Sequence, residues 1–303
     1  MRRRLSAAIL LSLLVLAALA SVFTFYGEVF ESAQSLSASK ASDYLVANYN
    51  SSIGMIPEVP KGHTYYVYSD NFLAAYALNG SSNPALRAIA SNITSTDARM
   101  LTGVPHPTSE YQVINSINGS FFASNNYVLA RPGSALIVTT LNNGTSPLNP
   151  SSYADVAFLE ALYFHWAGDR PHAVAQFDRG AKLYDGRGFN DKAFSGGQYQ
   201  TYKLALYDYV GKVLGAALPP DLEDHLEKLQ APDGGFHTGY SSDLSTNGTA
   251  TNTETTSLAI LALTAPSMKA QPSPFLIPIF LSATAAIVAA ELLLMRRKSR
   301  RTL

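Results

Sequence analysis

The sequence predicts a mainly α-helical domain, built from helical hairpins with a small β-hairpin and flanked by transmembrane segments. Three observations predict this class. Residues 5–25 and 275–295 are apolar blocks near the two ends of the 303-residue chain. Between them, segments with helical spacing of apolar residues recur, and several begin at capping residues. Around residues 127–141, two short apolar runs flank a Pro-Gly turn, which is typical of a β-hairpin.

The N-terminal block, residues 1–25, carries Arg2-Arg3-Arg4 followed by an uncharged stretch that is long enough to cross a bilayer. The small residues of Ala18-Leu19-Ala20 equally fit cleavage of a signal peptide, so a retained transmembrane helix and a cleaved signal both remain open. Residues 273–295 predict a second transmembrane helix and residues 296–303 a basic tail. The positive-inside rule then predicts a cell-membrane protein whose C-terminal tail is cytoplasmic and whose residues 26–272 are extracytoplasmic.

Composition narrows the class of partner. Residues 26–272 hold 14 Lys and Arg against 21 Asp and Glu, a difference of −7, which argues against nucleic acid and leaves the lipid bilayer as the expected partner. The absence of Cys excludes disulfides and thiolate metal sites, and the six His lack ligand spacing, so no metal or cofactor is predicted. Six Asn-x-Ser/Thr sites predict an exported, N-glycosylated chain: Asn50, Asn79, Asn92, Asn118, Asn143 and Asn247.

Apolar spacing and capping residues predict the elements in order. Helices are expected at 37–48, 69–78, 83–94, 151–167, 170–184, 198–214, 219–230 and 253–263. Residues 127–130 and 135–141 are expected to pair as strands across a turn at 131–134. We interpret residues 104–150, which contain this hairpin, as an insertion in the helical domain, and a small separate domain is the alternative.

Four expected helices share an ending in Ala-Leu or its equivalent. Their final residues are Leu78, Leu162, Leu206 and Leu263, and polar residues lie near the start of each. Small Ala side chains allow close helix contact, so the pattern indicates helical-hairpin repeats. The alternative is an irregular helical domain in which the endings recur because Ala and Leu are common helix formers.

One repeat carries a recognisable motif. Gln230-x-x-Asp233-Gly234-Gly235-Phe236, followed by Thr255-x-x-Leu258-Ala259-x-x-Ala262-Leu263, resembles the α/α-toroid superfamily, and residues 194–201 look like a weaker copy. The repeat is similar to those of terpenoid cyclases and prenyltransferase β-subunits, and the layout to six-hairpin glycosidases and polysaccharide lyases. The resemblance implies an α/α toroid or partial toroid over residues 37–264. The cyclase Asp-x-Asp-Asp motif and a zinc-binding Cys are absent, so it implies neither reaction.

In such a toroid the inner helices begin around a funnel, where their first residues would meet a substrate. Asp155 and Glu254 are the best pair of carboxylates for glycoside hydrolysis, with Asp70 next and His237 as a further acid or base. The alternative is that each carboxylate caps its helix. Tyr199, Phe236 and Tyr68 are candidate platforms for stacking on sugar rings, although aromatic residues in helical proteins commonly fill the core.

Together these features predict recognition or processing of a surface or extracellular carbohydrate, with a glycoside hydrolase or a polysaccharide lyase as the possible enzymes. The alternative is a non-catalytic surface scaffold that binds a membrane-protein partner. Isoprenoid or lipid processing is a third hypothesis, which follows from the resemblance alone.

Overall fold

Helices dominate the chain in a computed structural model that describes residues 36–60, 64–104, 107–108, 110–115, 124–142 and 148–266. The mainly α class is confirmed for these residues. They form one helix over residues 36–47, then α2 (Tyr68–Asn79), α3 (Pro84–Met100), α4 (Ala154–Trp166), α5 (Arg170–Ala181), α6 (Thr201–Leu214), α7 (Leu222–Lys228) and α8 (Thr253–Thr264).

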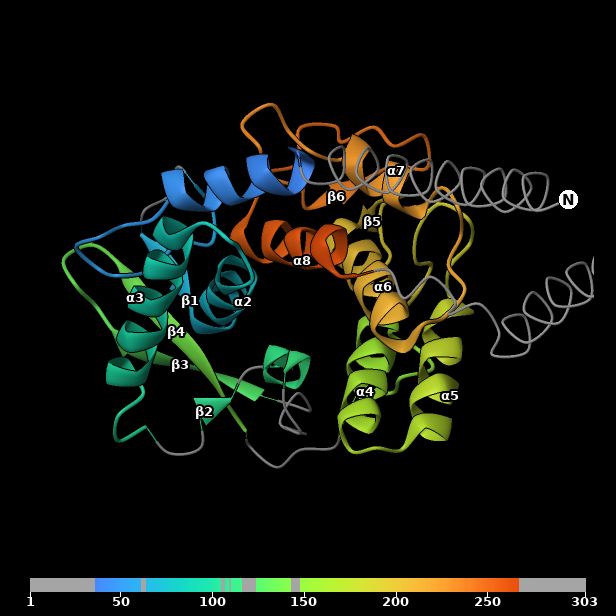
Figure 1. The fold of residues 1–303 in the computed structure, drawn as a ribbon, viewed down its shortest axis with the longest axis horizontal. Helices are drawn as coiled ribbons and strands as arrows, with labels where there is room; N and C mark the ends of the chain where they lie inside the picture. Colours follow the sequence, from blue (N-terminus) through green and yellow to red (C-terminus); the bar gives the residue numbers. More distant parts are fainter. Residues whose placement is uncertain are drawn as a thin grey trace, which may run out of the picture. The chain divides into compact units, whose positions relative to one another are not determined.

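Four of these helices pack side by side in the order α2, α8, α6, α4 (Figure 1). Each of α2, α4 and α6 packs against the next helix in the chain, which is α3, α5 and α7 respectively. The four helices of the row, α2, α8, α6 and α4, are rich in fully buried apolar residues. Examples are Leu73, Phe158, Leu204 and Leu258. Because α3 and α5 bury only three or four residues each, their polar faces remain in water.

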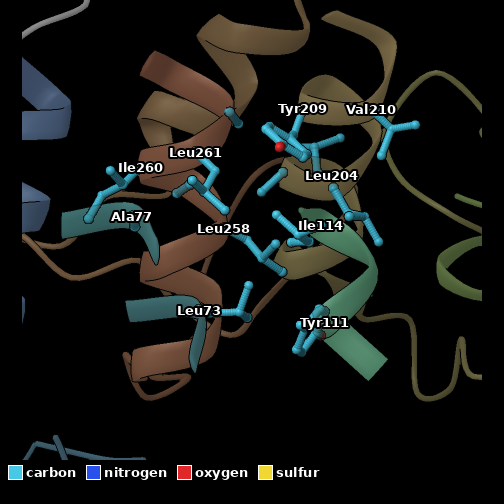
Figure 2. Close-up of a cluster of buried hydrophobic side chains, with 14 of the residues drawn as sticks. Leu73, Ala77, Tyr111, Ile114, Leu204, Tyr209, Val210, Leu258, Ile260 and Leu261 are labelled. Carbon is cyan, nitrogen blue, oxygen red and sulfur yellow. The ribbon is translucent and has the colours of Figure 1, made fainter. Parts of the chain in front are cut away.

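A short 3₁₀ helix, η1 (Glu110–Ile114), joins the two ends of this row, because it contacts both α2 and α4. Its Val113 and Ile114 are fully buried, and the indole nitrogen of Trp166 donates a 2.9 Å hydrogen bond to the carbonyl of Val113. Figure 2 shows Ile114 among Leu204 and Leu258, which come from α6 and α8. Apolar side chains therefore fill the space that the four helices and η1 enclose.

The predicted hairpin is confirmed, and it belongs to a larger sheet. β3 (Ser124–Ala130) and β4 (Leu136–Asn142) pair antiparallel across the expected turn. The two-residue β2 (Pro107–Thr108) also pairs with β4, and so does β1 (Tyr65–Val67), which runs parallel to it. A separate pair, β5 (Tyr199–Gln200) with β6 (Gly239–Tyr240), joins the loops before α6 and α8.

Some element bounds differ from the prediction. α3 continues to Met100, beyond the expected end at 94, because the polar residues that follow are accommodated on an outer helix. α6 starts at Thr201, since the two residues before it form β5. The predicted spans at 1–25 and 273–295 lie outside the described residues, and no described helix is both long and apolar enough to cross a membrane.

The turn after α7 depends on a glycine. Gly234 has φ +94°, and a Cβ there would lie 2.3 Å from the backbone oxygen of Lys40 in the helix over residues 36–47. We expect Gly234→Ala to lower the free energy of unfolding by about 2–4 kcal/mol, measured by urea denaturation. Gly186→Ala is the matched control, because Gly186 has φ +93° with open space around it. If both variants lose the same free energy of unfolding, the close approach of the added Cβ to Lys40 does not contribute to the loss.

Candidate functional site

The charges of two acidic residues from different helices act on one tyrosine hydroxyl. Tyr202, in the first turn of α6, donates a 2.7 Å hydrogen bond to Oδ2 of Asp155, in the first turn of α4. Burial raises the pKa of Tyr202 well above its usual value, and the charges of Asp155 and Glu254 raise it further. Glu254, in the first turn of α8, accepts a 2.5 Å hydrogen bond from the hydroxyl of Tyr111 in η1. We call Asp155, Tyr202, Glu254 and Tyr111 the acid cluster.

Beneath the acid cluster lies a buried ion pair. Nζ of Lys203 is 2.5 Å from Oδ2 of Asp191, and both side chains are 1% exposed. Asp191 also accepts the backbone N–H groups of Ala154 and Ala193, at 2.9 Å each, and so satisfies a free donor at the start of α4. Nζ of Lys203 is 3.5 Å from Oδ1 of Asp155. Asp191 and Lys203 are therefore structural, and Lys203 also places a positive charge beside Asp155.

The three candidate acids are not the caps of their helices. The cap of α8 is Asn252, whose side chain accepts from the N–H of Thr255 at 2.9 Å. The cap positions of α4 and α2 are held by Tyr153 and Val67, so Asp155 and Asp70 lie inside the first turns. The capping alternative thus does not account for these carboxylates, although the helix dipole stabilises negative charge at all three positions.

Some buried polar atoms at the starts of α4 and α6 accept no hydrogen bond, although one of them, Oδ1 of Asp155, faces the ammonium of Lys203 at 3.5 Å. Within the described residues, six buried side-chain atoms have no hydrogen-bond partner, and three of them are Oδ1 of Asp155, Oε1 of Gln200 and Oγ1 of Thr201. All three belong to the starts of α4 and α6. Such atoms in a native protein commonly mark a place where water or a ligand binds. The side chain of Asp155 is 23% exposed, and Tyr202 and Glu254 are half-buried, so solvent reaches the cluster.

Asp70 and Tyr68 lie on α2, beside α8. Asp70 is buried in the first turn, where its charge contributes to a raised pKa of Tyr65. The hydroxyl of Tyr68 accepts a 3.2 Å hydrogen bond from Nε2 of Gln112 in η1. These contacts place both residues near η1 and β1, and none of them joins the residues to the acid cluster.

The other predicted site residues lie in packed loops. Tyr199 is 7% exposed and donates a 2.6 Å hydrogen bond to Asp185, and Phe236 is fully buried. Nδ1 of His237 is 2.6 Å from the carbonyl oxygen of Thr249. A sugar platform needs an exposed ring face, which Tyr199 and Phe236 do not have in this conformation. We therefore leave these three residues out of the proposed site.

Sequence reasoning missed Lys203, Asp191 and Tyr111. Lys203 carried a signal, because a lone charge in an apolar stretch of helix needs a partner when buried. Tyr111 carried none, since its partner is 143 residues away in the chain. Of the predicted glycosylation sites, Asn79, Asn92 and Asn247 are exposed, while Nδ2 of Asn50 donates to Tyr66 at 2.9 Å. Asn118 and Asn143 lie outside the described residues.

Comparison with known proteins assigns no family. No family model, curated protein or solved structure matches the chain. Among the described residues, no group of three His, Cys, Asp or Glu side chains could hold a metal ion.

Proposed function

We propose that the protein binds a carbohydrate at the starts of α4, α6 and α8 and hydrolyses a glycosidic bond there. The observation that carries this proposal is the hydrogen bond from Tyr202 to Asp155, together with the charge of Glu254, which also acts on Tyr202. Glycoside hydrolysis uses two carboxyl groups on either side of the scissile bond. Sugar hydroxyls also donate hydrogen bonds readily to carboxylates, so the same residues suit binding.

Asp155 and Glu254 have different roles in this proposal. Asp155 faces a positive charge and a hydrogen-bond donor, because Nζ of Lys203 lies 3.5 Å from Oδ1 and Tyr202 donates to Oδ2. It would act as the base that activates water or as the nucleophile. Glu254 would then give its proton to the oxygen of the leaving sugar.

Hydrolysis fits the cluster better than the elimination catalysed by polysaccharide lyases. Elimination needs a strong base and a cation that neutralises the carboxylate of an acidic sugar. The raised pKa of Tyr202 keeps its hydroxyl protonated, which makes it a poor base. Lys203 is 1% exposed and already paired with Asp191, so it is not available to a substrate carboxylate.

The fold that we propose for this site is a small α/α toroid. The packing order α2, α8, α6, α4 supports it, and so does η1, which contacts both ends of that row. The apolar terminal segments support a membrane-anchored protein with the helical domain outside the cell. Exposure of Asn79, Asn92 and Asn247 is compatible with glycosylation in that location.

The test is binding and hydrolysis by the full-length protein in detergent. A glycan array would identify a ligand, and release of reducing ends from neutral oligosaccharides would report hydrolysis. We expect Asp155→Asn and Glu254→Gln each to lower the rate about 10²–10⁴-fold. Glu160→Gln, on α4 but away from its first turn, is the matched control and should leave the rate unchanged.

Full activity in both variants would overturn the proposal. Absence of any sugar binding, together with co-purification of a fixed membrane partner, would instead favour the surface scaffold.

A further inference from the structure

The segment over residues 36–58, which we call the strap, joins α2 to α8, two neighbours in the row of helices. Ile56 in the strap donates its N–H to Oδ1 of Asn71 at 2.7 Å, and its carbonyl accepts from Nδ2 of the same residue at 2.9 Å. Asn71 lies in the first turn of α2 and is fully buried. The strap is therefore fixed to the start of α2 directly before its last two residues.

Those last two residues, Pro57 and Glu58, bond to the first residue of α8. The N–H of Thr253 donates a 2.9 Å hydrogen bond to the carbonyl of Glu58, and its hydroxyl donates a 2.6 Å hydrogen bond to the carbonyl of Pro57. Thr253 is 1% exposed. The first N–H groups of a helix have no partner inside the helix, so the strap satisfies one of them and fixes the point where α8 begins.

The helix of the strap is attached to the loop before α8 as well. Nε2 of Gln230 donates a 2.9 Å hydrogen bond to the carbonyl of Ser37, and the hydroxyl of Tyr44 donates a 3.1 Å hydrogen bond to Oγ1 of Thr251. The partners in these two pairs are 193 and 207 residues apart in the chain. The strap thus brings the beginning of the described chain against its last loop and its last helix.

We infer that the strap sets the start of α8, with Thr253 as a positioning residue for the acid cluster. Glu254 directly follows Thr253, so a displacement of Thr253 moves the backbone that carries this carboxylate. The inference rests on the proposed function, because it concerns a residue of the same cluster. It holds whatever groups bond to the side chain of Glu254, because the strap acts on the backbone of the first turn.

Position matters more for the rate than for binding. A displacement of about 1 Å in a catalytic group can lower a rate by about 10²-fold, because the reacting atoms no longer meet in the required geometry. An interaction that is needed mainly in the transition state changes kcat more than KM. A loosened start of α8 is therefore expected to lower kcat and to leave KM nearly unchanged.

The test is Thr253→Val in the full-length protein in detergent, because valine keeps the shape of threonine and removes the hydroxyl that donates to Pro57. The substrate is the neutral oligosaccharide that the wild type hydrolyses fastest. We expect kcat to fall about 10–100-fold, with KM changed by less than about twofold. Thr253→Ser restores the hydroxyl and should recover most of the rate. Hydrogen exchange of residues 252–258, followed by mass spectrometry, should be faster in Thr253→Val than in the wild type.

Ser257→Ala is the matched control. It also removes a buried hydroxyl from α8, but that hydroxyl donates a 2.7 Å hydrogen bond to the carbonyl of Thr253 within the same helix. It should leave kcat at the wild-type value.

A second variant replaces Thr253→Val if that protein does not fold. Tyr44→Phe removes the hydroxyl that donates to Thr251 and should lower kcat by at least about twofold. Its control is Ser42→Ala, because the hydroxyl of Ser42 bonds within the strap to the carbonyl of Ala38.

The outcomes separate the two claims. If Glu254→Gln abolishes hydrolysis but Thr253→Val keeps the wild-type kcat, or if Ser257→Ala lowers kcat equally, the positioning role is overturned and the proposed function stands. If the wild type hydrolyses no oligosaccharide, or if Glu254→Gln retains full hydrolysis, the proposed function fails, and the positioning role fails with it. A fall in kcat that Thr253→Ser reverses supports both.

Discussion

Replacing Lys203 by Met lowers the free energy of unfolding by about 3–5 kcal/mol. The side chains of Lys203 and Asp191 are each 1% exposed, with 2.5 Å between Nζ and Oδ2. Removal of the ammonium leaves Asp191 buried as an uncompensated charge and takes the cation away from Asp155. A Met side chain fills a similar volume, so the loss reflects charge more than packing. Urea denaturation of the full-length protein, followed by circular dichroism, measures it.

The double variant Lys203→Met with Asp191→Asn tests the cause. In this double variant no buried charge lacks a partner, and the Asn oxygen can still accept from the N–H of Ala154. We therefore expect the double variant to recover more than half of the free energy of unfolding that Lys203→Met loses. If the double variant is as unstable as the sum of the two single variants, the ion pair is not what stabilises this region.

Replacing Asp97 by Asn stabilises the protein, by an amount that grows with pH. Asp97 on α3 is 7% exposed and its Oδ1 has no hydrogen-bond partner among the described residues. Burial raises its pKa from 3.8 to about 8. Between these values the folded chain keeps a proton that the unfolded chain releases, so rising pH favours unfolding. The total effect is about 6 kcal/mol, absent below pH 4 and complete above pH 8.

Melting temperatures of the wild type and Asp97→Asn from pH 4 to pH 9 measure this effect. The two curves should meet near pH 4 and separate as pH rises through the pKa of the folded state. Asp43→Asn, at an exposed position of the helix over residues 36–47, is the control and should follow the wild type throughout. Parallel curves for wild type and Asp97→Asn would show that Asp97 is already ionised in the folded protein.

Helices and the hairpin were predictable because their signals are local. The expected start of α8 at residue 253 is confirmed, whereas α4 begins at Ala154 and not at the expected residue 151. Asp155 and Glu254 lie in the first turns of these two helices. The Pro-Gly turn between β3 and β4 was equally clear. By contrast, no strand was predicted at Tyr65–Val67, because its partner β4 lies some 70 residues later in the chain.

In the candidate site, too, local sequence signals were predictable and long-range contacts were not. Sequence reasoning could place Asp155 and Glu254 at helix starts, but it could not predict the hydrogen bond from Tyr202 to Asp155. It also proposed Tyr199 and Phe236, whose rings are buried in loops in the structure. Whether an aromatic ring is exposed for sugar stacking or buried in the core depends on which residues cover it. The spacing of residues along the chain does not determine this.

The sequence by itself determined which segments are helices, where a hairpin turns and which carboxylates open a helix, because each depends on neighbours within about ten residues. Only the tertiary structure decided that η1 closes the row of α2, α8, α6 and α4, that Lys203 pairs with Asp191, and that Tyr111 donates a hydrogen bond to Glu254. Those contacts depend on how distant segments pack around a shared core, where shape and burial select partners that local patterns do not encode.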